Sequence, residues 1–218
     1  MFTRSSIFRF ARAILFCGST AMVAAEFPDP KIDSKPLQGK QTVVLAGGCF
    51  WCTEAVFEIM EGVDSVISGY AGGTKDTAKY DLVSTGRTGH AESILLTYDP
   101  SKTSYGQLLK IFFSVAHDPT SLNRQGADVG PQYRSAIFYT SDEQKAIANA
   151  YIKQLNEARI LSKPIVTQVV PLEKFYTAEN YHQDYSGRNR SDSYVVNVSD
   201  PKVEKLKKLY PGCVRKRK

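Results

Sequence analysis

The sequence predicts an α+β sandwich of the ferredoxin-like, split β-α-β type, with peripheral helices and long active-site loops. Apolar patterns follow one another as strand, helix, strand, strand, helix and strand, and then as one more helix and strand. No internal repeat and no inter-domain linker interrupts this order. The chain has 218 residues, of which 42% are hydrophobic and 23% charged, which suits one domain with a full core and excludes wholesale disorder.

Local patterns define the first half of the core. The apolar run Thr42–Ala46 predicts a strand, and helical spacing predicts a helix from about Phe50 to Met60. Val63–Ser68 has the pattern of a second strand. Ala91–Tyr98 alternates as a strand does, and Asp99-Pro100 ends it.

The second half of the core follows by the same rules. Tyr105–Ala116 places its large apolar residues on one helical face. Ser135–Tyr139 predicts a strand, and Ser141 with Gln144 forms a capping box for a helix that reaches about residue 158. A strand over 165–171 and short helices near 178–185 and 201–209 complete the chain.

Two long segments between these elements are expected to be functional loops. Tyr70–Gly89 is rich in Gly and Thr, with a short helix near Tyr80–Ser84. His117–Pro131 is the second such loop. Both are longer than a simple connection between neighbouring elements requires.

The N-terminus has the layout of a secretory signal peptide over residues 1–25. Three arginines precede an apolar run over 13–24, small residues follow, and no acidic residue comes before Glu26. We expect cleavage before Glu26 and a periplasmic or secreted protein, with a mitochondrial presequence as the alternative. Residues 26–40, with three prolines, form an extended lead-in to a domain over 41–200.

The net charge of +6 comes from the two ends of the chain. Residues 1–25 carry +3 and residues 202–218 carry +7, so residues 26–201 carry −4. Residues 201–218 are expected to form a basic C-terminal tail that carries Cys213. No basic face with interleaved aromatic residues is present, which disfavours nucleic-acid binding.

The segment Gly47-Gly48-Cys49-Phe50-Trp51-Cys52 lies at a strand-to-helix junction. Free backbone N–H groups and the helix dipole favour a thiolate there, and the glycines allow a sharp turn. We therefore interpret Cys49 as an activated nucleophile rather than a buried core cysteine. Zinc is disfavoured, because the cysteines and the scattered histidines form no second ligand pair at metal spacing.

Strand alternation makes Glu92 a candidate general acid. Glu92 shares a strand face with Ile94 and Leu96, and a carboxyl on an apolar face is desolvated. Desolvation raises its pKa and keeps a proton available near neutral pH. The alternative is a carboxylate at a strand end that simply reaches solvent.

Several motifs in order make the chain resemble the peptide methionine sulfoxide reductase A family from about Thr42 to Tyr185. They are Gly48-Cys49-Phe50-Trp51, Gly69-Tyr70-Ala71-Gly72-Gly73, Thr88-Gly89-His90-Ala91-Glu92, His117-Asp118-Pro119, the run from Gly126 to Ser135, and Ala178-Glu179-Asn180-Tyr181-His182-Gln183. The resemblance implies an α+β fold and reduction of the S epimer of methionine sulfoxide, free or in proteins.

The resemblance also implies a role for each matched residue. Cys49 would attack the sulfoxide sulfur and become a sulfenic acid, and Glu92 would protonate the sulfoxide oxygen. The other implied roles are hydrogen bonding to that oxygen by Tyr80 and Tyr133, enclosure of the substrate methyl group by Phe50 and Trp51, and substrate holding by Asp128.

A second thiol must resolve the sulfenic acid. Cys52 is the preferred candidate because of its C-x-x-C spacing from Cys49, and Cys213 could reach the site on a mobile tail or pass the disulfide outward. Thioredoxin or a similar dithiol would then reduce the disulfide. We expect a monomer with no cofactor, no bound metal and no stable membrane insertion.

Two alternatives compete with this reading. A thioredoxin-like disulfide oxidoreductase would also use Cys49 and Cys52 at a helix start, but it leaves Glu92 and the long loops unexplained. A non-catalytic binding module of the cell envelope would use Trp51 in an aromatic pocket and would not need Cys49.

Overall fold

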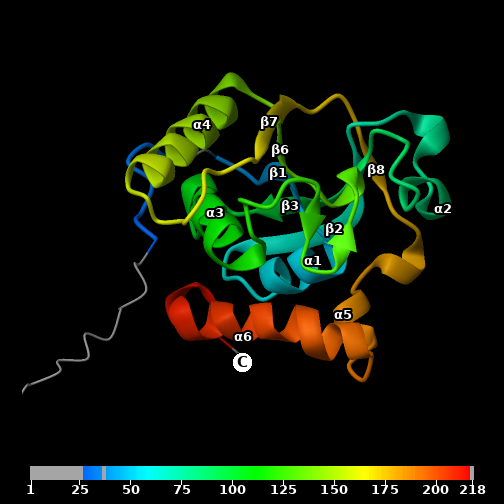
Figure 1. Ribbon diagram of the computed structural model, residues 1–218. Helices are drawn as coiled ribbons and strands as arrows, with labels where there is room; N and C mark the ends of the chain where they lie inside the picture. Colours follow the sequence, from blue (N-terminus) through cyan, green and yellow to red (C-terminus); the bar gives the residue numbers. More distant parts are fainter. Residues whose placement is uncertain (1–26, 36–37, 217–218) are drawn as a thin grey trace, which may run out of the picture.

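The computed structural model describes residues 27–35 and 38–216, so the expected signal peptide and its cleavage before Glu26 lie outside the described residues. A six-stranded sheet with the order β7-β6-β1-β3-β2-β8 is its centre (Figure 1). Neighbouring strands are antiparallel, except β6 and β7, which are parallel. The strands are β1 (Gln41–Gly47), β2 (Val63–Ala71), β3 (Ala91–Tyr98), β6 (Ser135–Tyr139), β7 (Gln168–Pro171) and β8 (Phe175–Thr177).

The predicted split β-α-β arrangement is confirmed in the four central strands. Helix α1 (Phe50–Glu58) connects β1 to β2, and α3 (Tyr105–Ile111) lies between β3 and β6. This gives the order β6-β1-β3-β2 in the middle of the sheet. The last turns of the helix expected over 105–116 form a wider π-helix, η2 (Phe112–Ala116).

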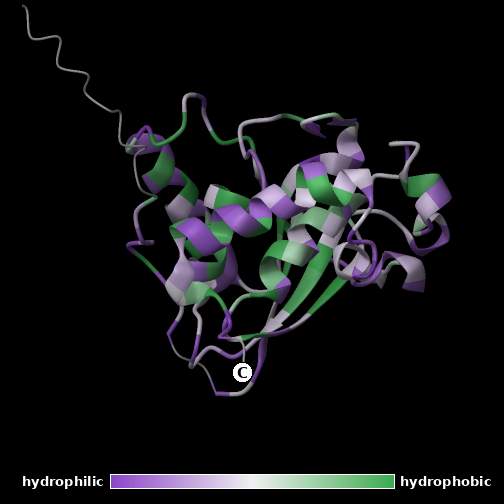
Figure 2. Ribbon diagram, turned by 90° about the horizontal axis from the view of Figure 1, so that it is seen from below, coloured by the Kyte–Doolittle hydropathy of each residue, from purple (hydrophilic) through white to green (hydrophobic). Residues whose placement is uncertain are grey.

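The two faces of the sheet bury different amounts of apolar surface. Val43 and Leu45 of β1 point into the main core, whereas Val44 and Ala46 belong to a small cluster on the opposite face. Figure 2 shows hydrophobic residues concentrated on the strands behind more hydrophilic helices. Helix α4 (Asp142–Glu157) begins at Ser141, whose hydroxyl accepts a hydrogen bond from the Gln144 amide at 3.2 Å as the capping box predicts.

The long loops contain short elements that position side chains. The first loop holds η1 (Lys75–Thr77) and α2 (Tyr80–Val83). The second holds the two-stranded hairpin β4 (Arg124–Gln125) and β5 (Asp128–Val129), followed by η3 (Pro131–Tyr133).

The chain after β7 differs from the expected short helix near 178–185. Strand β8 comes first, followed by η4 (Asn180–His182) and α5 (Tyr185–Arg188). Asp184 lies between these two short helices with φ 51°, in the left-handed region, and this conformation prevents a continuous helix.

The C-terminal segment is packed against the domain rather than extended as a tail. Helix α6 (Asp200–Leu209) follows the π-helix η5 (Val195–Ser199) and lies alongside α1 (Figure 1). After η6 (Pro211–Cys213), the Cys213 carbonyl accepts a hydrogen bond from the Glu61 amide at 2.8 Å. Val214 forms a β-bridge with Met60. Cys213 is therefore fixed just beyond the C-terminal end of α1.

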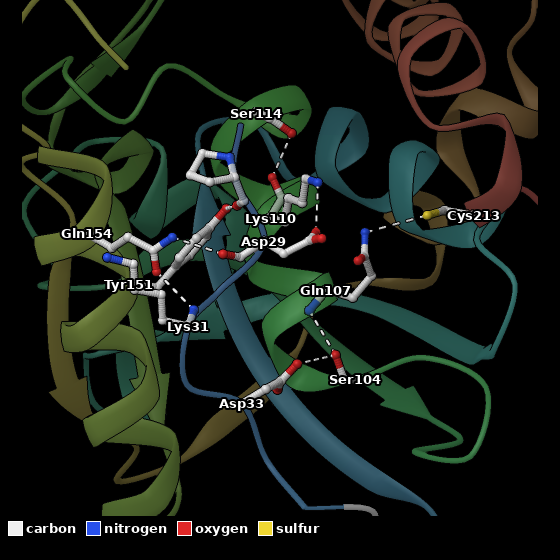
Figure 3. Close-up of polar contacts among 11 residues, drawn as sticks. Asp29, Lys31, Asp33, Ser104, Gln107, Lys110, Ser114, Tyr151, Gln154 and Cys213 are labelled. Atoms are coloured by element: carbon white, nitrogen blue, oxygen red, sulfur yellow. Dashed lines mark hydrogen bonds and ion pairs between the residues drawn. The ribbon is translucent and has the colours of Figure 1, made fainter. Parts of the chain in front are cut away.

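The described part of the lead-in packs against α3 and α4 (Figure 3). Asp29 forms an ion pair with the buried Lys110 at 2.8 Å. The Pro28 carbonyl accepts a hydrogen bond from the Tyr151 hydroxyl at 2.8 Å, and Asp33 accepts one from the Gly106 amide at 2.7 Å. These bonds hold the extended segment on the domain.

Within residues 27–35 and 38–216, no helix combines the length and the apolar character that a membrane span needs.

Candidate active site

Cys49 stands between the end of β1 and the first turn of α1, where it is the N-cap residue. Gly48 makes this junction possible because its φ is +89°. A side chain at Gly48 would also lie 2.7 Å from Gln125 Cβ and collide with Gln125 Cγ. Gln125 in turn fixes the loop, since its side chain exchanges hydrogen bonds of 2.9 and 2.7 Å with the Asp118 backbone.

Glu92 is buried beside this helix start, at the beginning of β3. Its side chain is 2% exposed, and its Oε2 accepts a hydrogen bond from the Phe50 amide at 3.1 Å. Burial raises the pKa of Glu92 to about 8, with a further contribution from Asp128. The carboxyl therefore keeps its proton at neutral pH, as its place on an apolar strand face predicts.

The two thiols of the C-x-x-C pair have different acidities. Burial, hydrogen bonding with Cys52 and the charge of Glu92 raise the pKa of Cys49 well above its usual value. Hydrogen bonding with Cys49 lowers the pKa of Cys52 to about 7, and the positive charge of Lys202 contributes to this shift. The thiolate that the helix start predicts for Cys49 is thus opposed by burial, and Cys52 is the more acidic thiol of the resting site.

Aromatic rings from two distant segments surround Trp51. Tyr185 stacks on its indole with centroids 3.6 Å apart and an interplanar angle of 7°. The indole N–H donates to His182 Nδ1 at 3.1 Å, and the same imidazole lies 4.9 Å from the Phe50 ring. The Phe50 side chain is buried beneath this group of rings, whereas Trp51 is only partly buried.

The two tyrosines indicated by the resemblance lie near the reactive groups. Burial and the charges of Glu92 and Cys49 raise the pKa of both Tyr80 and Tyr133. Tyr80 enters from α2, and its ring centroid is 4.4 Å from that of His182. Tyr133 enters from η3, which directly follows the second long loop.

Asp128 reaches the site from β5 and is held by a residue that sequence reasoning missed. The Tyr194 hydroxyl donates to Asp128 Oδ2 at 2.5 Å and lies 3.8 Å from the Cys52 sulfur. The Tyr194 ring also meets Trp51 edge-on. All site residues inferred from the sequence except Cys213 therefore come together around the start of α1.

Four site neighbours were not assigned roles from the sequence, and they come from one late segment of the chain. Aromatic and ionisable residues are frequent in the sequence after β8, and this frequency could have indicated the segment. Only its first part is among the motifs that match the family. Glu179 shows what this segment does, because its carboxylate accepts hydrogen bonds from the Tyr80 amide at 2.9 Å and the Tyr70 hydroxyl at 2.8 Å. The four are Glu179, His182, Tyr185 and Tyr194.

A cavity of about 450 Å³ opens beside Cys49. One wall is the loop from Val115 to Asp128, and the other is formed by η5 and the first turns of α6. Of the site residues described above, Cys49, Asp128 and Tyr194 line it, whereas Glu92 and Trp51 do not.

Cys213 lies away from this cavity. Its sulfur accepts a hydrogen bond from Gln107 Nε2 of α3 at 3.5 Å (Figure 3). It stands beyond the C-terminal end of α1, whereas Cys49 caps the N-terminal end, and at a rise of about 1.5 Å per residue the helix separates them by roughly 15 Å.

Within the described part of the chain, no group of three or more His, Cys, Asp or Glu side chains could hold a metal ion.

A family model described as peptide methionine sulfoxide reductase matches residues 41–212. The chain belongs to the peptide methionine sulfoxide reductase family. This membership confirms the resemblance and the predicted class of enzyme, a reductase of methionine sulfoxide.

Similar proteins support the assignment. The chain is 53% identical over 181 residues to peptide methionine sulfoxide reductase MsrA 2 of Mesorhizobium japonicum, and the match covers 83% of the chain and 93% of that relative. It is 52% identical over 187 residues to the protein of the same name from Synechocystis, with 84% and 87% covered.

Solved structures of this family share the fold. The reduced form of Mxr1 from Saccharomyces cerevisiae superposes with a TM-score of 0.67 at 30% identity, covering 74% of the chain and 92% of that structure. Methionine sulfoxide reductase A of Corynebacterium diphtheriae gives 0.62 at 33% identity, covering 72% and 78%. These matches favour the reductase over the thioredoxin-like alternative.

We predict that Gly48→Ala lowers the free energy of unfolding by about 2 kcal/mol or more, because a left-handed backbone and a collision with Gln125 add together. Urea unfolding measures the change. Gly187→Ala is the matched control, since nothing lies within 4 Å of an added Cβ there, and it should stay within about 0.5 kcal/mol of the parent. Equal stability of the two variants would contradict the argument.

Proposed function

We propose that the enzyme reduces the S epimer of methionine sulfoxide, in proteins and as the free amino acid, by transferring the oxygen to Cys49. One observation carries the proposal: a buried carboxyl with a pKa of about 8, Glu92, is hydrogen-bonded to the helix turn that presents the Cys49 thiol. The choice of the S epimer rests on the motif resemblance.

In the first step, the Cys49 sulfur attacks the sulfoxide sulfur while Glu92 gives its proton to the sulfoxide oxygen. The proton of the Cys49 thiol replaces the one that Glu92 loses. The oxygen then passes from the substrate sulfur to the Cys49 sulfur, so that the new S–S bond and the substrate S–O bond both break, which leaves methionine and a Cys49 sulfenic acid. The substrate sulfur is reduced by two electrons and Cys49 is oxidised by two. Tyr80 and Tyr133 hydrogen-bond the oxygen, which their position near Glu92 and Cys49 supports.

The substrate is held by groups around this reaction centre. Phe50 and Trp51 enclose the methyl group, and the packing of Trp51 against Tyr185 makes that wall rigid. Asp128 holds the substrate from the loop side, and its bond with the Tyr194 hydroxyl fixes its orientation.

Cys52 then attacks the sulfenic sulfur of Cys49, forming a disulfide and releasing water. The two residues are three apart across the first helical turn, where side chains face each other within the span of a disulfide. The lowered pKa of Cys52 supplies a thiolate near pH 7. Cys213 could take part only after its backbone bonds with the end of α1 are released.

Thioredoxin or a similar dithiol would reduce the Cys49–Cys52 disulfide, so the reaction needs no cofactor. Export to the periplasm or the outside of the cell is part of the proposal. It is supported by the pattern of residues 1–25, and mitochondrial import is the alternative.

Separated epimers of methionine sulfoxide test the proposed reaction. With dithiothreitol as reductant, the parent protein should convert the S epimer and leave the R epimer unchanged, and Cys49→Ser should show only background conversion. Chromatographic measurement of methionine gives the readout. Absence of S-epimer turnover by the parent protein would falsify the proposal.

Glu92 predicts a pH dependence. The rate of the parent protein should fall above about pH 8 as Glu92 loses its proton, and Glu92→Gln should be slower by about 10²- to 10⁴-fold at neutral pH and lack this decline. Stopped assays across pH 6–10 measure both. A parent profile that stays flat to pH 10 would contradict the role of Glu92.

The same carboxyl predicts an effect on stability. Because the pKa of Glu92 is raised, the folded state binds this proton more tightly than the unfolded state does. The free energy of unfolding therefore decreases as the pH rises from about 4.5, and the decrease is complete above about pH 8. Glu92→Gln should therefore exceed the parent by about 1–3 kcal/mol at pH 9 and not at pH 4. Urea unfolding measures this, with the exposed Glu61→Gln as a control that shows no such difference.

Disulfide mapping tests the resolving step. After one turnover without reductant, mass spectrometry should find a Cys49–Cys52 bond and a free Cys213. Cys213→Ser should keep thioredoxin-supported turnover, whereas Cys52→Ser should stop at the sulfenic acid after one cycle. A Cys49–Cys213 bond as the sole product would exclude the assignment of Cys52.

A further inference from the structure

Two lysines of α6 face the cavity beside Cys49. We propose that Lys202 and Lys205 form a subsite for a carboxylate that neighbours the sulfoxide, so that the enzyme favours oxidised methionines beside an acidic group. This inference rests on the proposed function and names the substrate class that the site prefers.

The cavity connects the reacting thiol to these lysines. Cys49 lines one part of it, and Lys202 and Lys205 line the wall formed by α6. Val115 and Val198 add apolar side chains to the lining. Adjacent residues of a bound peptide are about 3.8 Å apart at Cα, so a group next to the sulfoxide residue lies within a cavity of this size.

Neither lysine is neutralised by the protein. Among the described residues, no carboxylate lies within 4.0 Å of either ammonium group, although the same helix offers such pairs elsewhere. Lys207 binds Glu204 at 2.7 Å, and Asp200 binds an arginine at 3.1 Å. Lys202 is partly buried and Lys205 is exposed, and both line the cavity.

The two ammonium groups also repel each other. They are three residues apart on α6 and therefore lie on the same helical face. Burial lowers the pKa of Lys205, and repulsion by Lys202 lowers it further. A carboxylate between them would relieve this repulsion and replace water lost on binding.

Among the described residues, the acidic side chains of the cavity form no ion pair with either lysine. Asp118 accepts hydrogen bonds from Thr120 and Ser121 of its own loop, at 2.7–2.9 Å. Asp128 is bound by the Tyr194 hydroxyl. Burial lowers the pKa of His117 to about 3, so this imidazole is neutral. Asp118 and Asp128 therefore keep their negative charges, but hydroxyl donors hold them more than 4.0 Å from both ammonium groups.

The carboxylate can come from two sources. One is an Asp or Glu side chain next to the oxidised methionine in a protein. The other is the α-carboxylate of methionine sulfoxide itself, when the residue is free or at a C-terminus. Both present the same anion one residue or less from the reacting sulfur.

A peptide series in single-turnover reactions without reductant tests the subsite, because the one methionine formed per enzyme is released before Cys52 and thioredoxin act. The peptides carry one S-methionine sulfoxide with Asp, Asn or Lys beside it, and a second pair ends at the sulfoxide residue as free acid or amide. The apparent second-order rate constant should be at least about threefold higher for the Asp peptide than for the Asn peptide, or for the free-acid peptide than for the amide peptide. High salt should reduce the preference.

In the double variant Lys202→Gln/Lys205→Gln, the ratio of the two rate constants should fall to about one. The matched control Lys207→Gln/Lys208→Gln removes the same charge from the same helix outside the cavity lining and should retain it. A preference limited to the free acid assigns the α-carboxylate, and one limited to Asp assigns a side chain.

Other outcomes overturn the subsite. Equal rates for Asp and Asn and for acid and amide would do so, as would an unchanged ratio in the Lys202→Gln/Lys205→Gln variant. If all peptides react at the same rate and the Lys202→Gln/Lys205→Gln variant has a raised KM for thioredoxin, the two lysines bind the reductant rather than the substrate. If no peptide reacts with the parent protein, the proposed reduction itself fails together with the subsite.

Discussion

The hydrogen bond from the Phe50 amide to the Glu92 carboxyl joins the catalytic helix to the sheet. The first amides of a helix have no partner within the helix, and this bond supplies one for α1. It also fixes the carboxyl at the turn that presents Cys49. Because Glu92 is buried on the core face of β3, burial raises the pKa of its carboxyl, and the bond from the Phe50 amide offsets part of that rise. Local structure, packing and the acidity of Glu92 therefore meet at one contact between residues 42 positions apart.

The C-terminal part of the chain covers the site. Residues from β8 to α6 cover the start of α1 and bring Tyr185 and Tyr194 to it. This layer limits exposure of Cys49 to 8% and buries Cys52 completely. A molecule that reacts with Cys49 must consequently reach it through a narrow opening, beside the cavity that η5 and α6 help to line. The C-terminal residues thus pack around the two thiols, whereas Cys213 lies away from them.

What the sequence allowed us to predict was local. Alternation predicts the bounds of β3, and the glycine pair predicts the sharp turn before Cys49. Alternation also made burial of Glu92 one of two possibilities, and the fold decides between them. The contact between Trp51 and His182 spans 131 positions, and no periodic pattern encodes it. The acidity order of the thiols was missed for a similar reason, because the helix start is visible in the sequence whereas the burial that raises the pKa of Cys49 is a property of the whole fold.

The chain contains a single tryptophan, and it is Trp51. Its indole stacks on Tyr185, donates to His182 and lies two residues from Cys49. Ultraviolet emission from indole in this protein therefore arises at the reaction centre alone, and a nearby thiol or imidazole quenches it to a degree that depends on distance and charge. The emission of unlabelled protein would therefore respond to a change in the oxidation state of Cys49 or Cys52 and to a change in the packing of Tyr185 on the indole.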